Sequence, residues 1–507
     1  MKSHIAVMRY YVLILTLMLT MGPAVLFAAE RLDLVPPQFL TAPIHAPEQI
    51  QDLISGRLTF AASKSPAQGG GGATGASTST ATFSLITQTD GVTTDAVNRL
   101  NSYQGETAIA KLPGLWVGGF NSIFPGQCSA ALANCAPGAT ISTTTVSWTT
   151  SSVPIMGNSL GFDPSVAVDA NGTIYYGYGV CSGSCQTANA IVATSTDGVS
   201  WTAHAVTAAQ GGIFDDKYWV AADPNPARAG RAYLAWDRNK GNNQTLFVSR
   251  TQDSGNTWSS PVKINDGTSQ SERVIYAMPA VDPTTGAVYV VWMDYAKKGL
   301  YVDKSTDGGA TWGKDVVAAS LSATFTDIGC NGGRSMASAP YIAVDSQGWV
   351  YVTYSDIKST TGMDVYLVYS KDAGQHWQGP YQLNDVTKGH QYNPALSVVG
   401  NGQIHASWLD RRDDPQNCLT HAYSAYSSGV FAADGTPQFS ANGRLTTASS
   451  NFDGNPNGPG DYTGIVAYPA GTSTAALPFF PTHLSSDTSA QTGQAGGYEA
   501  YVTEVQP

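Results

Sequence analysis

Short apolar segments alternate with polar turns along most of the chain. Examples are residues 163–179 (DPSVAVDANGTIYYGYG), 277–294 (AMPAVDPTTGAVYVVWMD) and 339–356 (APYIAVDSQGWVYVTYSD). In each, an apolar run, a turn containing Asp, Asn or Gly, and an aromatic-rich run follow one another. This pattern predicts two antiparallel strands joined by a tight turn. No long stretch has the period of a helix, so we expect an all-β protein.

A second phrase recurs between these strand pairs. Residues 251–258 (TQDSGNTW) and 305–312 (STDGGATW) both spell Ser/Thr-x-Asp-x-Gly-x-Thr-Trp, and residues 370–377 (SKDAGQHW) differ at one position. Residues 195–201 (STDGVSW) are a copy of the phrase that is one residue shorter. Residues 142–148 (STTTVSW) have the same shorter length but carry Thr144 in place of the Asp. The phrases begin at residues 142, 195, 251, 305 and 370, which gives a period of about 55 residues.

A fixed period of this length predicts a β-propeller, in which each period is one blade of four antiparallel strands. Looser copies of the strand pair at residues 106–121 and 461–480 bring the expected number of blades to seven, and to six if a weak copy is not a blade. We expect residues 81–88 (ATFSLITQ) to supply the outer strand of the last blade and to close the ring.

The recurring phrase resembles the Asp-box, also called the BNR repeat, of the sialidase-like β-propeller superfamily, and the resemblance covers residues 83–507. It implies that the boxes join the third and fourth strands of a blade, away from the ligand site. A short carboxylate in such a turn accepts backbone N–H bonds. The box residues are therefore expected to be structural, namely Asp197, Asp253, Asp307, Asp372, Trp201, Trp258, Trp312 and Trp377.

The N-terminus has the pattern of an exported protein. Residues 1–29 contain a basic start, an apolar run and a small-residue cleavage site, as a signal peptide does. Residues 30–62 are too short for a domain and are expected to be partly ordered, residues 63–82 form a Gly/Ser/Thr-rich linker, and residues 83–507 form the propeller. We expect a secreted, periplasmic or cell-surface protein without a membrane anchor after cleavage, and a monomer.

The net charge and the cysteines indicate which binding partners, compartment and cofactors to expect. The formal net charge of −11 argues against binding to nucleic acid or to an anionic membrane. Six cysteines fit an oxidising compartment. Their spacing favours Cys128–Cys135 and Cys181–Cys185 pairs, and the repeat phase brings Cys330 and Cys418 to the same face, which predicts a third disulfide. No histidine lies beside the close pairs at ligand spacing, so no metal and no cofactor are expected.

The candidate site lies on one face of the propeller. This loop face is formed by the loops that lead into the innermost strands and by those that join second to third strands. The candidate ligand-binding residues in these loops are Arg273, Tyr276, Arg334, Tyr392, Asp410, Arg411, Arg412 and Asp461. The run 410–414 (DRRDD) suits either an anion site or a salt-bridge network that links blades.

Three functions remain open on this face. A sialidase would use Tyr462 as nucleophile, Glu272 as its base and Asp215 or Asp216 as the acid, with Arg273, Arg334, and Arg411 or Arg412 binding a carboxylate. The family's Arg-Ile-Pro phrase is absent from the first blade, however. Another glycan-directed hydrolase or lyase would use carboxyl groups among Asp216, Glu272, Asp410 and Asp461. The third possibility, which we favour, is an extracellular propeller that binds a glycan or protein without turnover.

Overall fold

The computed structural model describes residues 82–83, 87–88, 105–121, 136–145, 147–158, 160–182, 185–241, 243–267, 272–331, 333–358, 360–400, 402–446, 449–453, 458–470, 473–482 and 499–506. All of them belong to the unit Thr74–Pro507. The predicted signal peptide, the segment 30–62 and the linker up to residue 81 lie outside the described residues.

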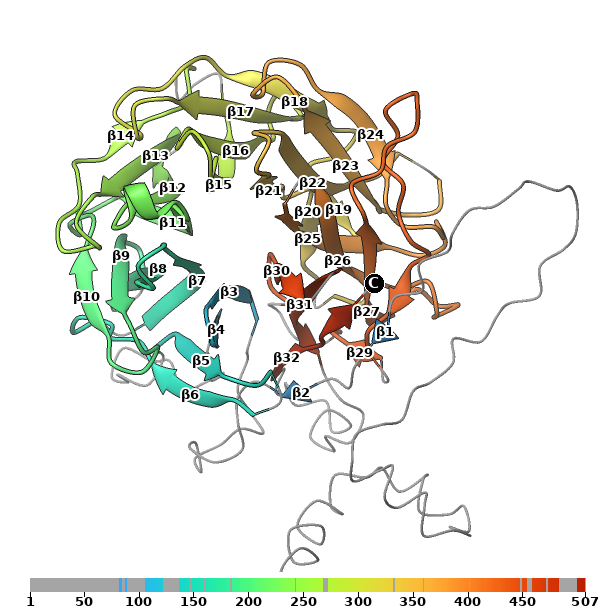
Figure 1. Ribbon diagram of the computed structural model, residues 1–507, viewed down its shortest axis with the longest axis horizontal. Coiled ribbons are helices and arrows are strands. Elements are labelled where there is room, and N and C mark those ends of the chain that lie inside the picture. Colours follow the sequence, from blue (N-terminus) through green and yellow to red (C-terminus); the bar gives the residue numbers. More distant parts are fainter. Residues whose placement is uncertain are drawn as a thin grey trace, which may run out of the picture. The chain divides into compact units, whose positions relative to one another are not determined.

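The strands follow one another as blades, which we number 1 to 7 (Figure 1). Within a blade the strands pair antiparallel, and a parallel pairing of β9 with β11 joins blades 2 and 3 into one sheet. Blade 1 contains β3 (Ala108–Leu112), β4 (Leu115–Phe120), β5 (Gly138–Ser142) and β6 (Thr149–Ser152). Blade 2 contains β7 (Leu160–Val168), β8 (Ile174–Cys181), β9 (Ala188–Ser195) and β10 (Thr202–Ala205). Blade 3 contains β11 (Phe214–Ala222), β12 (Ala232–Lys240), β13 (Asn243–Thr251) and β14 (Val262–Lys263), with the 3₁₀ helix η4 (Pro226–Arg228) after β11.

The remaining blades follow the same order. Blade 4 contains β15 (Val274–Val281), β16 (Val288–Asp294), β17 (Gly299–Ser305) and β18 (Val316–Ser320). A hairpin of β19 (Phe325–Asp327) and β20 (Ser335–Ala337) precedes blade 5, which contains β21 (Tyr341–Val344), β22 (Val350–Asp356), β23 (Asp364–Ser370) and β24 (Gln378–Gln382). Blade 6 contains β25 (Gln391–Val399), β26 (Gln403–Asp410), β27 (Leu419–Ser427), β28 (Gly443–Arg444) and β29 (Ser450–Asn451). Blade 7 contains β30 (Gly464–Ala470), β31 (Ser473–Thr482), β32 (Glu499–Val502) and β33 (Val505–Gln506).

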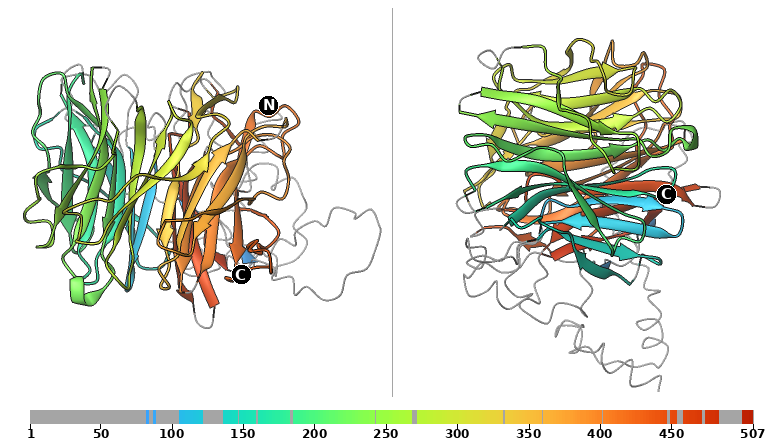
Figure 2. Two further views of the ribbon diagram at one scale, coloured as in Figure 1. Left: turned by 90° about the horizontal axis from the view of Figure 1, so that it is seen from above. Right: turned by 90° about the vertical axis from the view of Figure 1, so that its left-hand side faces the viewer.

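The first strand of each blade lies innermost, around a central axis (Figure 1). These strands contact one another in the order β3, β7, β11, β15, β21, β25 and β30, and β30 contacts β3. The strands run between two faces that carry the loops (Figure 2). The protein is thus an all-β propeller, as predicted. Among the described residues, no helix has the length and apolar character needed to cross a membrane.

Two short N-terminal strands belong to the sheet of blade 7. β1 (Thr82–Phe83) pairs antiparallel with β33, and β2 (Thr87–Gln88) pairs antiparallel with β32. Because β31 lies on the other side of β32 and β33, the N-terminal strands occupy the outer edge of this sheet. This is the position expected for residues 81–88.

Each full Asp-box is a hydrogen-bonded turn between the third and fourth strands. In blade 4 the Asp307 carboxylate accepts hydrogen bonds from the backbone N–H groups of Ala310 and Thr311, both at 2.9 Å, and from the hydroxyl of Ser305 at 2.8 Å. Hydrogen bonds from the hydroxyl and the backbone N–H of Thr311, together with those from Ser305 and Ala310, hold the pKa of Asp307 far below its usual range. Gly309 has φ +79°, which glycine adopts without strain. The carboxylate therefore organises the turn.

The box tryptophans connect neighbouring blades. Trp258 of blade 3 packs against a buried cluster that includes Tyr175 and Val192 of blade 2, and Trp312 of blade 4 packs against a cluster that includes Tyr233 and Val248 of blade 3. Burying a large aromatic side chain is among the largest single contributions to a core. The repeated Trp therefore fixes each box to the preceding blade as well as to its own.

Two of the predicted disulfides are confirmed. Cys181 pairs with Cys185, and Cys330 pairs with Cys418, each with a Cα–Cα distance of 5.1 Å. The second bridge joins the hairpin before blade 5 to the loop after the second strand of blade 6. Cys128 and Cys135 lie outside the described residues.

Candidate functional site

The innermost strands bend near their first residues. The register shifts between Phe162 and Ser165, between Asp216 and Trp219, between Ile275 and Met278, and between Tyr392 and Ala395, which marks a β-bulge in four blades. A residue with left-handed backbone lies in each bulge, with φ of 50° to 62°; these are Asp163, Lys217, Tyr276 and Asn393. Bulges redirect a side chain out of the regular alternation. Here they supply polar and aromatic side chains to the axis from four blades.

Lys217 is the centre of the resulting cluster. Its ammonium lies 2.8 Å from the Asp163 carboxylate, 2.5 Å from that of Asp461 and 3.9 Å from that of Glu106. Arg334 forms an ion pair with the other oxygen of Asp461. The three carboxyl groups around Lys217 thus come from blade 2 (Asp163) and from the residues just before blades 1 and 7 (Glu106 and Asp461). One ammonium connects blades that are far apart in the sequence.

A pair of facing carboxyl groups, one fully buried and one half-buried, lies beside this cluster. Asp216 and Asp237 are directly opposite each other on β11 and β12. Asp237 is fully buried, and its Oδ1 has no hydrogen-bond partner among the described residues. Asp216 Oδ1 accepts the backbone N–H of Lys217 at 3.0 Å. Facing carboxyl groups in a buried setting disfavour the doubly ionised state.

Burial and neighbouring charges make the pKa values of the axial carboxyl groups differ from one another. Burial raises the pKa of Asp216 to about 7; the Lys217 ammonium opposes the rise and the Asp163 carboxylate adds to it. Burial and the Asp163 charge also hold the pKa of Glu106 well above its usual range. Burial and the charge of Asp216 do the same for Asp237. Burial acts against ionisation of Asp163 too, but Lys217 and a hydrogen bond from Glu106 outweigh it and lower the pKa of Asp163 to about 2.

Asp461 remains an anion. Burial opposes this, but the charges of Lys217 and Arg334 hold the pKa of Asp461 below its usual range. At neutral pH the cluster therefore combines two cations, Lys217 and Arg334, with two carboxylates, Asp163 and Asp461. Glu106 and Asp237 retain their protons, and Asp216, with a pKa of about 7, is partly ionised.

A small pocket of about 20 Å³ opens beside the cluster on the axis. This volume accommodates about one water-sized group. Its polar lining residues are Lys217, Asn393 and Asp461, and its aromatic and apolar lining residues are Trp219, Tyr276, Ala277, Met278, Ala339, Pro340, Tyr341, Pro394 and Tyr462. Five of the seven blades contribute to it, or the segments just before them. The pocket is therefore a property of the assembled ring.

The structure separates the residues predicted for sialidase catalysis. Tyr462 lines the pocket, but its hydroxyl donates to the Pro164 carbonyl at 2.9 Å, and burial raises its pKa well above the usual range. Asp215 binds Arg238 at 2.6 Å and Thr207 at 2.8 Å within blade 3.

Glu272 has partners away from the tyrosine. It binds Lys297 at 2.5 Å and accepts from Asn265 at 2.7 Å. The carboxyl groups whose charges act on the Tyr462 hydroxyl are those of Asp163 and Glu106. Of the predicted catalytic residues, Tyr462 and Asp216 belong to the axial region.

The four predicted arginines are also not brought together as one set. Among the described residues, Arg334 pairs with Asp461 of the axial cluster. Arg411 is fully buried, and its guanidinium donates to the carbonyls of Ile328, Gly329, Cys330 and Asn417. The Arg273 guanidinium donates to the Glu272 carbonyl at 3.4 Å.

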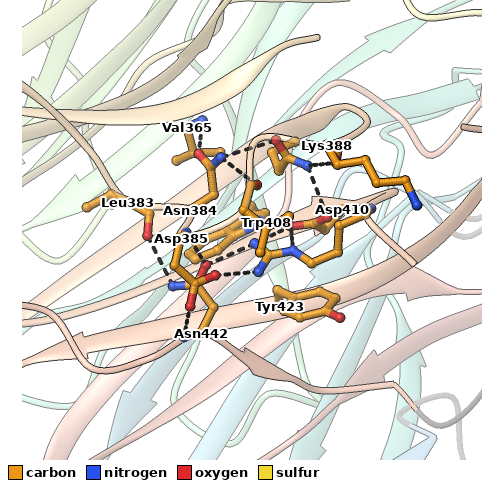
Figure 3. Close-up of polar contacts among 12 residues, drawn as sticks. Val365, Leu383, Asn384, Asp385, Lys388, Trp408, Asp410, Tyr423 and Asn442 are labelled. Atoms are coloured by element: carbon orange, nitrogen blue, oxygen red, sulfur yellow. Dashed lines mark hydrogen bonds and ion pairs between the residues drawn. The ribbon is translucent and has the colours of Figure 1, made fainter. Parts of the chain in front are cut away.

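Arg412 belongs to a salt-bridge network that links blades 5 and 6. Figure 3 shows its partners Asp385, Asp410 and Asn442. Arg412 binds Asp410 at 2.7 Å and Asp385 at 2.5 Å, donates to Asn442 at 2.9 Å, and lies over the Tyr423 ring. The backbone N–H of Asp385 also donates to Asn442 Oδ1 at 2.7 Å, and that of Asn442 donates to Asp385 Oδ2 at 3.0 Å. Of the two alternatives for residues 410–414, the contacts of Arg412 and Asp410 match the network.

The remaining candidates divide between the axis and the blade interior. Tyr276 lines the pocket, with Lys217 Nζ 5.8 Å from its ring centroid. Tyr392 is buried beneath Arg411, and its hydroxyl contacts that of Thr420 at 2.9 Å. Among the described residues, no group of three or more His, Cys, Asp or Glu has an arrangement that could hold a metal ion.

Sequence reasoning missed three contributors to the site, Glu106, Asp163 and Asn121. Asn121 donates to the Glu106 carboxylate, and its Oδ1 accepts the Asp163 backbone N–H at 2.9 Å. Glu106 and Asp163 precede or begin an innermost strand, as Lys217 and Asp461 do. Aligning all strand pairs by this phase is the signal that could have identified them.

Comparison with known proteins identifies the family. The model of the BNR repeat-like domain matches residues 149–406. A comparison with curated proteins found no match. Similar solved structures include a protein of unknown function from Dyadobacter fermentans DSM 18053 (10% identity, 84% of this chain and 99% of that chain, TM-score 0.47). Others are an α-L-arabinanase from Penicillium chrysogenum (15%, 72% and 99%, TM-score 0.43) and a mutant Trypanosoma rangeli sialidase displaying trans-sialidase activity (12%, 73% and 60%, TM-score 0.42). The chain belongs to the BNR repeat-like family.

Proposed function

We propose that this protein is exported and binds an uncharged glycan at the axial pocket of its loop face. The observation that carries the proposal is the charge balance of the cluster beside the pocket. Lys217 and Arg334 are each paired with carboxylates, at 2.8 Å and 2.5 Å for Lys217, so the cluster has no excess positive charge to attract an anion. An uncharged hydroxyl group can exchange hydrogen bonds with such a cluster without disturbing this balance.

The pocket lining supports the same ligand class. Trp219, Tyr276, Tyr341 and Tyr462 line it together with Lys217, Asn393 and Asp461. Sugars present both C–H surfaces, which pack on aromatic rings, and hydroxyl groups, which bind amides and ions. The predicted signal peptide and the two disulfides support an oxidising, extracytoplasmic location.

An anionic sugar fits the site less well. A carboxylate ligand is best held by guanidinium forks that are free to receive it. Arg334 is paired with Asp461, and Arg411 and Arg412 bind protein groups elsewhere. A ligand carboxylate would also lie close to Asp461 and Asp163. These contacts favour a neutral glycan over a sialoside.

The test is a glycan-array screen of the mature protein, residues 30–507, followed by calorimetric titration of each glycan that binds. Lys217→Met removes the ammonium at the centre of the cluster and should weaken binding of neutral glycans at least tenfold. Lys371→Met is the matched control, because Lys371 lies over Trp349, with Nζ 4.4 Å from the ring centroid, and not at the axis. Binding confined to sialylated glycans, or equal binding by Lys217→Met, would overturn the proposal.

A parallel assay addresses catalysis. The mature protein and Tyr462→Phe are incubated with a fluorogenic α-sialoside. We expect no release of fluorophore, because the Tyr462 hydroxyl is held by Pro164 and its pKa is well above the usual range. Release by the wild type that is lost in Tyr462→Phe would establish a sialidase instead.

A further inference from the structure

We propose that the glycan site extends beyond the axial pocket, and that the exposed ring of Phe325 stacks on a second or third unit of a bound oligosaccharide. The protein then binds oligosaccharides in preference to monosaccharides. This inference rests on the proposed function and specifies the length of the glycan. Three features of the structure lead to it: an exposed aromatic pair, its continuity with the pocket, and the fixed position of the hairpin that carries Phe325.

The aromatic pair lies on the loop face. Phe325 is in β19, in the segment that leads into blade 5, and Tyr295 is in the turn between β16 and β17. Phe325 is 43% exposed, and among the described residues it is the only exposed Phe, Tyr or Trp. Its ring packs edge-to-face on that of Tyr295, with the centroids 5.7 Å apart, and the Tyr295 hydroxyl donates to Gln244 Oε1 at 2.8 Å. Phe325 thus presents an aromatic surface to solvent.

One hydrophobic cluster connects this pair with the axial pocket. Tyr276 and Met278, which line the pocket, belong to the cluster, and Tyr295 packs against it. Three further lining residues also pack against it, namely Trp219, Ala339 and Tyr341. Through Tyr295, Phe325 therefore continues the apolar surface that begins in the pocket.

The strand register places Phe325 close to the pocket. Phe325 is paired directly with Ala337, and Ala339, two residues further along the chain, lines the pocket. The Ser338 N–H donates to the Thr324 carbonyl at 2.9 Å, so the pairing continues toward Ala339. With about 5 Å between paired Cα atoms and about 3.3 Å per residue along a strand, the Cα atoms of Phe325 and Ala339 lie roughly 8 Å apart. A sugar chain with one unit at the pocket can reach Phe325 with its next units.

The hairpin that carries Phe325 is held at its start and at its tip. Two backbone N–H groups before β19 donate to the buried carboxylate of Asp356, both at 3.1 Å. At the tip, the guanidinium of the buried Arg411 donates to three carbonyls of the hairpin, and Cys330 forms a disulfide with Cys418 of blade 6. Because these contacts fix the ring before a ligand arrives, stacking on it requires little ordering of the protein.

A sugar unit is the occupant that these observations favour. One face of a pyranose ring carries C–H groups that pack on an aromatic ring, while its hydroxyl groups remain in water. The pocket has a volume of only about 20 Å³, so a sugar bound there keeps most of its ring, and all units linked to it, on the loop face outside the pocket. Phe325 is the exposed aromatic ring that these linked units can reach.

The first test measures how affinity depends on glycan length. Cello-, manno- and xylo-oligosaccharides of one to four units, and the same length series of any neutral glycan that binds on the array, are titrated calorimetrically into the mature protein. In each series that binds, we expect the tetrasaccharide to bind at least tenfold more tightly than the monosaccharide. Equal affinities within twofold would overturn the inference while leaving the proposed glycan binding intact. If no sugar of any length binds, the proposed function fails and this inference fails with it.

Three variants assign the length dependence to the Phe325 ring. Phe325→Ala should weaken binding of the tetrasaccharide at least fivefold and leave the affinity for the monosaccharide within twofold of the wild type. Phe325→Leu keeps an apolar side chain without an aromatic face and should behave like Phe325→Ala, whereas Phe325→Tyr should retain the affinity of the wild type.

Val430→Ala is the matched control for these variants. Val430 is 51% exposed, but it lies in the connection after β27 and does not line the pocket, so its replacement should leave both affinities unchanged. Unchanged affinity of Phe325→Ala or Phe325→Leu for the tetrasaccharide would overturn the stacking role of Phe325. Equal losses for monosaccharide and tetrasaccharide would also overturn it, since Phe325 would then act on the pocket itself.

Discussion

Asp216→Asn should stabilise the protein by an amount that grows as the pH rises from 4 to 8. In the folded protein the pKa of Asp216 is raised to about 7 from an ordinary value of 3.8, chiefly by burial. Because the folded state then binds the proton more tightly than the unfolded state, folding becomes less favourable as pH rises through this interval. Asparagine has the shape of the protonated acid and cannot ionise. Its oxygen can still accept the Lys217 backbone N–H.

The magnitude follows from the two pKa values. A pKa that moves from 3.8 to about 7 corresponds to roughly 4 kcal/mol at high pH. Asp216 is partly exposed, so solvent screens part of this difference, and we expect a gain of about 2 kcal/mol or more at pH 8. At pH 4 both proteins carry an uncharged group at this position and should be equally stable.

The assay is urea unfolding of the mature wild type and Asp216→Asn at unit intervals between pH 4 and pH 8. The quantity of interest is the difference in free energy of unfolding between the two, since other titrating groups contribute equally to both. Asp453→Asn, at an exposed carboxyl group, is the control and should show no such trend. A difference that stays constant from pH 4 to pH 8 would show that Asp216 ionises as in the unfolded chain and would refute this account of the axial cluster.

Three further changes test the scaffold. Deleting residues 81–88 should lower the unfolding temperature of the whole propeller, because β1 and β2 pair with β33 and β32, whereas deleting eight linker residues (65–72) should not; unchanged unfolding would contradict a role in closing the ring. Replacing Cys330 and Cys418 by Ser should cost about 4 kcal/mol in urea unfolding and the Cys181/Cys185 pair about 2 kcal/mol, since their sequence separations are 88 and 4; equal losses would exclude the loop-entropy explanation. Gly255→Ala should destabilise the protein by about 1 kcal/mol or more relative to Gly241→Ala. A Cβ at Gly255 would lie 2.5 Å from the Thr194 side chain, whereas a Cβ at Gly241 would have no atom within 4 Å. The free energies of unfolding are compared by urea unfolding. Because both glycines have a positive φ, the backbone strain is similar in the two variants, and equal losses of stability would show that the contact with Thr194 has no effect.

The blades and their boxes could be predicted because they depend on neighbours in sequence. Alternating apolar runs place strands, and a turn such as 305–312 contains within eight residues the Ser, Asp, Gly and Trp that organise it. The Cys330–Cys418 disulfide could also be predicted, because the phase of the repeats is enough to place both residues on the loop face.

The site could be predicted only in outline. The same phase placed Tyr276, Arg334, Asp461 and Tyr462 on the loop face, and their contacts lie around the axis there. It did not reveal the role of Arg411, because the carbonyls that hold this side chain come from residues some 80 positions earlier. It also gave no reason to group Glu106 with Asp461, which lie at opposite ends of the propeller sequence.

The sequence by itself determined an all-β chain of repeating blades with Asp-boxes and two cysteine pairs, because strands, turns and repeats depend on residues close together in the sequence. Only the tertiary structure decided which polar groups meet at the axis and which of them keep their protons. The bulges turn the side chains of Asp163, Lys217 and Asn393 toward the axis. These side chains form a site only because the ring brings residues of different blades together there. The charges there follow from burial and from several carboxyl groups competing for one ammonium, and both exist only in the closed assembly of blades.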